Sequence, residues 1–423
     1  MINSFRFDNI GEEYKAATLS NGLEVRVVEK PEFCSCYAAF AVNYGGVDRR
    51  FELDGKLLDT PAGIAHYLEH KLFDMPNGDN SLAVLTANGA DPNAFTSSVM
   101  TCYYFQCTEG FYENLQILLN FVTTPYFTPE TVDKERGIIG QEIMMGLDNP
   151  DRALYYNLLR LLYRNHPIKD EVAGSVESIS RITAQTLYDC HRAFYCPGNM
   201  VLCVEGNVSA EKVVEVAEKT LSGWKSSPVP CSDYGESDGL IPYSERVSVK
   251  LPVSEKQFLI GAKVIPTAGD YTRQQLSARL GLQVMLGPSS EFYNRLYAEG
   301  LINQSFNWDI DYAAGVATIM IGGESPDPDA VLAELETTVE KIGRDGLDPV
   351  LFLRAKKASI GGSLRDFEDF DNVCIGMAEG IFNNFCIFEA PAILEALSIE
   401  ECSGFIAEHL SSDRLAISIV EPV

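Results

Sequence analysis

The chain has 423 residues, more than one hydrophobic core usually organises, so we expect two domains or two halves of one architecture. Hydrophobic residues make up 46% of the sequence and charged residues 22%, which is typical of globular proteins and excludes bulk disorder. The 33 Lys and Arg residues against 60 Asp and Glu residues leave a formal net charge of -27. Because such a negative field repels polyphosphates and anionic lipids, we expect neither nucleic-acid binding nor membrane adhesion.

The cysteines and the N-terminus indicate the compartment. The 11 cysteines include no C-x-x-C pair and no disulfide-like framework, and apolar contexts such as residues 201–204 predict buried free thiols. The N-terminus has no basic stretch followed by an apolar run, and no segment reaches about 18 uninterrupted apolar residues. We therefore expect a cytoplasmic protein without a membrane span.

Apolar periodicity predicts an α+β unit in the first half of the chain. In chain order the predicted elements are strands at 23–28 and 36–42, a helix that enters at Thr60-Pro61 and runs through Ile64 to Leu72, a helix at 81–88, a long strand at 93–106, helices at 110–122, 129–145, 152–163 and 184–194, a strand at 200–205 and a helix at 210–221. We expect the helices to cover one face of a sheet.

A polar stretch rich in Ser, Pro and Gly follows and has no apolar period, which predicts a linker at 223–244. Beyond it the elements resume, with strands at 246–250 and 257–264, a helix at 272–286, a hairpin at 303–310 and 315–321, long helices and a last strand at 414–419. This order echoes the first half. We therefore predict an α+β fold of two structurally similar halves, 1–222 with the metal site and 245–423 without metal ligands, each a mostly antiparallel sheet covered by helices.

Two of the five histidines fall in the string His66-Tyr67-Leu68-Glu69-His70. On a helix, residues four apart lie one turn apart on the same face, so both imidazoles can reach one metal ion at about 2.0 to 2.1 Å. Glu69 points to the edge of that face, where it can hold a metal-bound water without being a ligand. A pair of histidines packed in a core is the alternative, but H-x-x-E-H is known as an inverted zinc-hydrolase signature.

Zinc-dependent hydrolysis needs this combination of residue types. A zinc ion brings the pKa of its water near neutrality, and an adjacent carboxylate takes the proton as hydroxide attacks a carbonyl. Two imidazoles and one carboxylate leave a fourth coordination position open for water, whereas four protein ligands would close the site. We therefore expect a third protein ligand elsewhere in the chain.

Two carboxylates seven residues apart are candidates for that ligand. Glu135 and Glu142 are separated by about two turns of the helix predicted at 129–145, so they share a face. One of them can bind the metal while the other orients a histidine. The spacing alone does not say which, and it also suits surface carboxylates on an ordinary amphipathic helix.

Several segments resemble the pitrilysin/insulinase family of zinc metallopeptidases. Residues 63–73 look like the family's zinc motif, Asn93-Ala94-Phe95-Thr96 resembles its N-A-x-T strand, and residues 135–142 match its distal glutamate helix. Residues 166–174 and 195–200 are similar to the rest of the half-domain. The resemblance covers essentially the whole chain and is nearest to bacterial YmfH-like members.

The resemblance implies roles for the residues of the metal motif. It implies one zinc ion per chain, held by His66, His70 and Glu142. Glu69 would be the general base. Glu135 would be the acid that orients a zinc-ligating histidine without binding the metal itself.

The resemblance also implies how substrates and partners bind. Two chains, identical or related, would form a closed chamber that admits unfolded peptides. A peptide would add as an extra β-strand at the sheet edge formed by Asn93, Ala94, Phe95 and Thr96.

The second half departs from the pattern of active family members, which usually carry an Arg and, about six or seven residues later, a Tyr that bind substrate. Alignment on Gly300-Leu301 places Leu296 or Tyr297 at the Arg position and Asn303 at the Tyr position, although Arg295 lies close by. We therefore hypothesise that a related subunit supplies the Arg/Tyr pair in an obligate heterodimer. An inefficient or specialised homodimer is the alternative.

Two functions of different kinds fit these observations. The first is a zinc-dependent endopeptidase that hydrolyses short or unfolded peptides. The second is a non-catalytic or partner-dependent scaffold subunit of the same architecture. Because the three implied ligands and the implied base are all present, we favour the enzyme.

Overall fold

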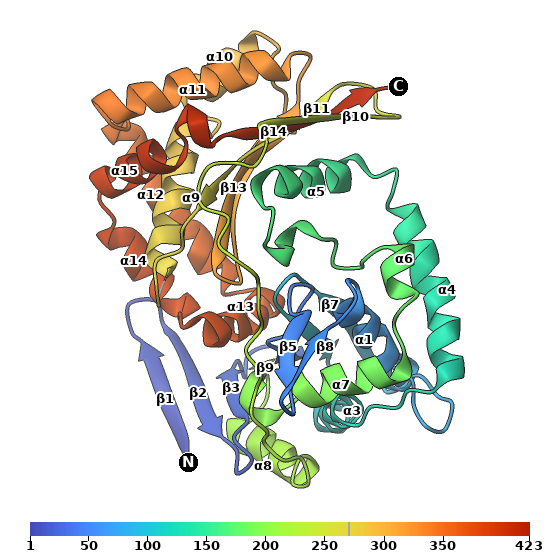
Figure 1. Ribbon diagram of the computed structural model, residues 1–423. Coiled ribbons are helices and arrows are strands. Elements are labelled where there is room, and N and C mark those ends of the chain that lie inside the picture. The colour runs from blue at the N-terminus through green and yellow to red at the C-terminus, as the bar shows by residue number, and fades with distance from the viewer. Residues whose placement is uncertain (270) are drawn as a thin grey trace. The chain divides into compact units, whose positions relative to one another are not determined.

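The computed structural model describes residues 1–269 and 271–423, and the chain divides into two compact units (Figure 1). Each unit is assembled from three segments of the chain. The first unit consists of Met1–Ile143, Glu171–Tyr234 and Arg365–Phe388, and the second of Met144–Asp170, Gly235–Leu364 and Glu389–Val423.

The first unit is built on a seven-stranded sheet. Its strands are β1 (Ile2–Phe7), β2 (Glu12–Thr18), β3 (Glu24–Glu29), β4 (Cys36–Val42), β7 (Ala90–Thr96), β8 (Thr101–Cys107) and β9 (Met200–Gly206). Their spatial order is β1-β2-β3-β9-β4-β8-β7, and all neighbours are antiparallel except the parallel pair β3 and β9. A separate hairpin is formed by β5 (Arg50–Leu53) and β6 (Lys56–Asp59).

Helices cover both faces of this sheet. The helical elements of the unit are α1 (Ile64–Leu72), α2 (Ser81–Ala87), α3 (Phe111–Thr123), most of α4 (Pro129–Met145), α6 (Val176–Ile179), α7 (Ala184–Phe194), η2 (Pro197–Asn199), α8 (Ala210–Thr220), α13 (Phe370–Asn383) and part of η3 (Ile387–Glu389). In β4, Ala38 and Phe40 belong to the core shared with α1, α3, α7 and α8, while Ala39 and Ala41 belong to the core shared with α13. The expectation that helices cover one face is therefore wrong for this sheet.

The second unit is built on a five-stranded sheet. Its strands are β10 (Arg246–Leu251), β11 (Gln257–Val264), β12 (Asn307–Ala313), β13 (Val316–Glu324) and β14 (Ala416–Pro422), in the order β10-β14-β11-β13-β12. Its helical elements are α5 (Pro150–Leu162), η1 (Pro167–Lys169), α9 (Thr272–Leu286), α10 (Glu291–Ala298), α11 (Pro328–Asp345), α12 (Pro349–Asp366), α14 (Ala390–Ala396), α15 (Ile399–His409) and η4 (Ser412–Arg414). Within this unit α5 packs on β11 and β14.

The two sheets share one topology. The strands β3-β9-β4-β8-β7 correspond in order to β10-β14-β11-β13-β12, and in both sheets the first pair is parallel and the other three are antiparallel. The predicted α+β fold of two similar halves is thus confirmed.

The segments that make up each unit differ from the predicted division at 1–222, 223–244 and 245–423. Helix α5, which comes from the first half of the sequence, belongs to the second unit, and α13 from the second half belongs to the first unit. Both helices follow a long helix in the chain, α4 and α12 respectively, so the halves exchange helices at equivalent positions. Contiguous ranges cannot describe such an exchange.

The predicted long strand at 93–106 is wrong, because the chain turns back between β7 and β8. The Ser97 hydroxyl accepts hydrogen bonds from the backbone N–H groups of Val99 and Met100, at 3.2 and 3.0 Å, and so fixes a tight turn. The periodicity of the two strands continues across this turn. The turn could therefore not be recognised from the sequence pattern.

Helix α1 begins at Ile64, and its N-cap is Gly63 rather than Thr60. Gly63 has a φ of 95°, and a Cβ atom there would lie 2.6 Å from the carbonyl oxygen of Ala173. Only glycine therefore fits where the chain enters the helix.

No single helix of the described ranges is long and apolar enough to cross a membrane; α13 and residues 387–396 reach that length and composition only together, across a 100° bend.

A buried carboxyl group lies under α13. Glu205 of β9 is 0% exposed, and neither carboxyl oxygen has a hydrogen-bond partner within the described ranges. Burial raises the pKa of Glu205 from the usual 4.5 to about 8, with a smaller opposing effect from Lys30 and reinforcing effects from Glu12 and Asp369. Glu205 is therefore protonated in the folded protein at neutral pH.

This pKa predicts a pH-dependent stability. Between its unfolded value near 4.5 and its folded value of about 8, Glu205 holds a proton only in the folded state, so its contribution to stability falls as pH rises through that window. We expect the stability advantage of Glu205→Gln over the wild type to grow by about 4 kcal/mol between pH 5 and pH 9. Urea unfolding at each pH measures it, with Glu113→Gln on the exposed side of α3 as control. A difference that is constant with pH would contradict the prediction.

Candidate metal centre

Helix α1 carries the two histidines of the H-x-x-E-H string on one side. Tyr67, Leu68 and Leu72 are buried in the core of the first unit, which fixes the orientation of the helix. His66 and His70 lie one turn apart on the other side, and their ring centroids are 4.6 Å apart. The spacing in the sequence thus becomes a pair of neighbouring imidazoles.

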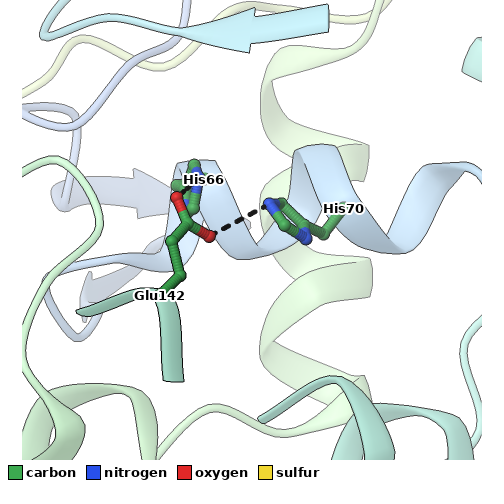
Figure 2. Close-up of side chains that lie close together, drawn as sticks. All are labelled: His66, His70 and Glu142. Carbon is green, nitrogen blue, oxygen red and sulfur yellow. Dashed lines mark ion pairs between the residues drawn. The ribbon is translucent and has the colours of Figure 1, made fainter. Parts of the chain in front are cut away.

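Glu142 of α4 reaches this pair from a different helix (Figure 2). Its Oε1 atom lies 3.5 Å from Nε2 of His66, and its Oε2 atom lies 3.7 Å from Nε2 of His70. One ligand atom from each of the three residues lies within 4.8 Å of the other two. The structure therefore brings together His66, His70 and Glu142.

The donor set and its spacing fit a zinc ion. Two ligands at about 2.1 Å from an ion in a tetrahedral arrangement are about 3.4 Å apart, close to the two His–Glu separations above. Two imidazoles and one carboxylate are also the ligands of hydrolytic zinc sites with one open position.

Glu135 contacts the far side of the His70 ring. Its Oε1 atom lies 3.0 Å from Nδ1 of His70. Because a carboxylate only accepts hydrogen bonds, Nδ1 must carry the proton, which leaves the Nε2 lone pair free toward Glu142. This contact lowers the pKa of Glu135. Burial acts to lower the pKa of His70, but the Glu135 hydrogen bond and the carboxylates of Glu69 and Glu142 together raise it.

His66 is more deeply enclosed than His70. Burial, and to a smaller extent the neighbouring His70, lower the pKa of His66 to about 4, against a smaller opposing effect of Glu135. The ring is therefore neutral at neutral pH, the form in which imidazole binds a metal ion. Its Nδ1 atom is buried and has no hydrogen-bond partner in the part of the chain that the structure describes.

Glu69 lies on α1 beside the ligand cluster and is only 7% exposed. Burial raises its pKa, while a hydrogen bond from Thr96 and the nearby His70 act to lower it. The Thr96 hydroxyl donates to Oε2 of Glu69 at 2.6 Å. Sequence analysis did not foresee this contact, because it depends on where β7 passes α1.

The four residues predicted to bind substrate lie on β7, at one end of the seven-stranded sheet. Ala94 packs against the core that contains α1, and Phe95 packs against the core under α13, so their side chains point to opposite faces. The exposed Asn93 side chain accepts a hydrogen bond from the Ala94 N–H group at 2.9 Å. In the described residues β7 pairs with β8 alone, which leaves its other edge open.

The residues at the expected Arg and Tyr positions lie in the second unit. Leu296 is buried and Tyr297 is 46% exposed on α10. The neighbouring Arg295 forms an ion pair with Glu334, and the Asn303 side chain donates to Glu324 at 2.7 Å. Arg295 and Asn303 are thus both engaged within their own unit.

A two-halved α+β fold with an H-x-x-E-H helix and a distal glutamate defines the class of inverted-motif zinc peptidases. Residues 55–176 match the model of insulinase (peptidase family M16), and residues 181–359 match that of the peptidase M16 inactive domain. The chain is 33% identical over 430 residues to the uncharacterized zinc protease YmfH of Bacillus subtilis (strain 168), with 100% of both chains covered. The chain therefore belongs to peptidase family M16, the pitrilysin/insulinase family.

Solved structures give the same result. A putative M16-like peptidase from Alicyclobacillus acidocaldarius superimposes with a TM-score of 0.93 at 32% identity, covering 97% of this chain and 99% of that one. A protease from Helicobacter pylori has a TM-score of 0.84 at 19% identity, with 97% and 100% covered, and shares the fold. The predicted family and its YmfH-like relatives are thus confirmed.

The contact between His70 and Glu135 predicts an effect on metal affinity. Glu135→Gln keeps the size of the side chain but removes the charge that orients the imidazole, so we expect zinc affinity to fall about 10- to 100-fold. Competition with a chromophoric chelator measures the affinity. Glu130→Gln, an exposed residue in the first turn of α4, is the matched control. Equal affinities of the Glu135 variant and the wild type would contradict this role.

Proposed function

We propose that the protein is a zinc-dependent endopeptidase that hydrolyses short or unfolded peptides. The convergence of His66, His70 and Glu142 from two helices, with the buried carboxyl of Glu69 beside them, carries the proposal. Membership of family M16 and the zinc-protease names of its relatives support the same reaction.

Each residue of the site has its own role in the proposed hydrolysis. His66, His70 and Glu142 would hold one zinc ion per chain, which when bound lowers the pKa of water and polarises the scissile carbonyl. Glu69 accepts a proton from the attacking water as the new carbon–oxygen bond forms. It then returns that proton to the leaving nitrogen as the carbon–nitrogen bond breaks. Glu135 keeps the His70 ring in the orientation that ligation needs.

The open edge of β7 supports the proposed mode of substrate binding. A peptide that adds there as a strand is held by backbone hydrogen bonds, so affinity depends little on its sequence. To use the Ala94 N–H group it must displace the Asn93 side chain, which satisfies that donor in the free protein. Only an extended segment can pair in this way, which favours unfolded substrates.

The alternative is a non-catalytic or partner-dependent scaffold subunit. It is favoured by one observation, the absence of an Arg/Tyr pair at the expected positions, where Leu296 or Tyr297 and Asn303 stand. A dimer with a related subunit that supplies the pair would reconcile this departure with the intact metal site. The buried free thiols agree with a cytoplasmic location for either function.

The proposed general base gives a direct test. Glu69→Gln removes the proton acceptor but none of the zinc ligands, so we expect kcat on an unstructured peptide to fall about a hundredfold or more. Zinc content, measured by mass spectrometry of the metal, should stay at one per chain. A chelator should also abolish cleavage, and added zinc should restore it.

Glu113→Gln serves as the control, because this glutamate lies exposed on α3 and contributes nothing to the site. If the wild type holds no stoichiometric zinc, or if the Glu69 variant cleaves peptide at the wild-type rate, the scaffold function is the correct one.

The composition of the native dimer tests the partner. We expect the natively expressed protein to co-purify with a second chain of similar length that carries the Arg/Tyr pair, and expect mixing the two to raise kcat/KM. Mass spectrometry of the purified complex identifies the chains. If the protein alone reaches a kcat/KM of about 10⁵ M⁻¹s⁻¹ or more, the heterodimer hypothesis fails.

A further inference from the structure

The Thr96 side chain points at the proposed general base. Thr96 is the last residue of β7, and its hydroxyl donates to Oε2 of Glu69 at 2.6 Å. This is a short bond to a carboxyl group that is only 7% exposed, so water competes little for it. It is also the only hydrogen bond that Glu69 receives from a side chain in the described residues.

The turn that follows Thr96 does not need this hydroxyl. The turn is held by the Ser97 hydroxyl and by a backbone bond from the Ser97 N–H group to the carbonyl of Met100, at 2.8 Å. A role in local folding therefore does not explain the Thr96 side chain.

A second hydroxyl lies directly behind the first. Thr101 of β8 is the register partner of Thr96, and the two Oγ1 atoms are 3.3 Å apart. Thr101 is fully buried and donates its own proton to the carbonyl oxygen of Tyr44 at 2.9 Å. Because a hydroxyl has one proton and two lone pairs, Thr101 can offer Thr96 only an acceptor.

The Thr96 hydroxyl thus has two acceptors in reach, one on each side. When Glu69 is a carboxylate, Thr96 donates to it, as the 2.6 Å bond indicates. The bond to Oε2 leaves the other carboxyl oxygen, Oε1, free to act as the base. With Thr96 donating to Glu69 and Thr101 donating to Tyr44, each hydroxyl has an acceptor for its one proton.

We propose that Thr96 is a positioning residue for Glu69: its hydroxyl holds Oε2 of the carboxyl group, and Thr101 fixes the Thr96 side chain from the other side. This inference rests on the proposed function, because the orientation of Glu69 matters to a peptidase in which Glu69 is the base. It assigns the Thr96 side chain to the base, while its backbone remains part of the edge strand.

Substitutions at Thr96 test the proposal. Thr96→Val keeps the shape and removes the hydroxyl, and the loss of a hydrogen bond to a charged group corresponds to about a 10- to 100-fold fall in kcat. KM, zinc content and the urea midpoint should change little. Thr96→Ser restores the hydroxyl, so we expect kcat within about threefold of the wild type. Thr18→Val, at an exposed strand position of the same unit, is the matched control.

Substitutions at Thr101 provide a second, independent test of the proposal. Thr101→Val should lower kcat by less, about 3- to 10-fold, because Thr101 contacts Thr96 and not Glu69, and Thr101→Ser should restore it. The serine variant also controls for any loss of folding that Thr101→Val causes by leaving the Tyr44 carbonyl unpaired. A wild-type kcat in Thr96→Val, or no rescue by serine, overturns the proposal while the proposed function stands.

Crystal structures of the zinc-loaded Thr96→Val and Thr96→Ser proteins provide a readout that does not depend on activity. We expect the Glu69 carboxylate to rotate away from its wild-type position in the valine variant and to keep that position in the serine variant. An unmoved carboxylate in both variants would refute positioning by Thr96. This result decides the question even if the wild type cleaves no peptide, in which case the proposed function fails separately.

Discussion

The approach of α4 to α1 is the constraint on which the whole site depends. The buried residues of α4 are Val132, Ile139 and Ile143, and they dock one side of the helix in the core of the first unit. The Tyr67 hydroxyl of α1 donates to the carbonyl of Val132, which joins the two helices at one end. With that side fixed, Glu135 and Glu142 face α1: Glu135 contacts Nδ1 of His70, and Glu142 lies near the Nε2 atoms of both histidines. A metal ion would complete an arrangement that packing has already set, so little reorganisation is needed to bind it.

Sequence analysis predicted the helices and strands that carry the site more accurately than it predicted the contacts between them. The bounds of β4, α4, α7, β11 and α9 agree with the prediction. Spacing left the choice between Glu135 and Glu142 open, since residues seven apart on a helix are equivalent by periodicity. Only the distances in the folded structure show that Glu142 faces both imidazole rings, whereas Glu135 contacts the far side of the His70 ring alone. The bond between Thr96 and Glu69 joins residues of a strand and a helix, and no local pattern encodes it.

The exchange of α5 and α13 escaped prediction for a similar reason. Sequence reasoning assigns neighbouring segments to one domain, whereas here each sheet takes a helix from the other half of the chain. A signal was nevertheless present in β4, where Cys36-Tyr37-Ala38-Ala39-Phe40-Ala41-Val42 contains no polar position and every residue is buried. A strand without alternation indicates cover on both faces.

This exchange has a consequence for biosynthesis. Because α13 spans Phe370–Asn383, the sheet of the first unit must keep one apolar face uncovered until residue 383 has been synthesised and has left the ribosome. The contacts that close it join residues far apart in sequence, and such contacts form slowly. Until then this face is open to aggregation, and neither contiguous half of the sequence contains every element of its own unit.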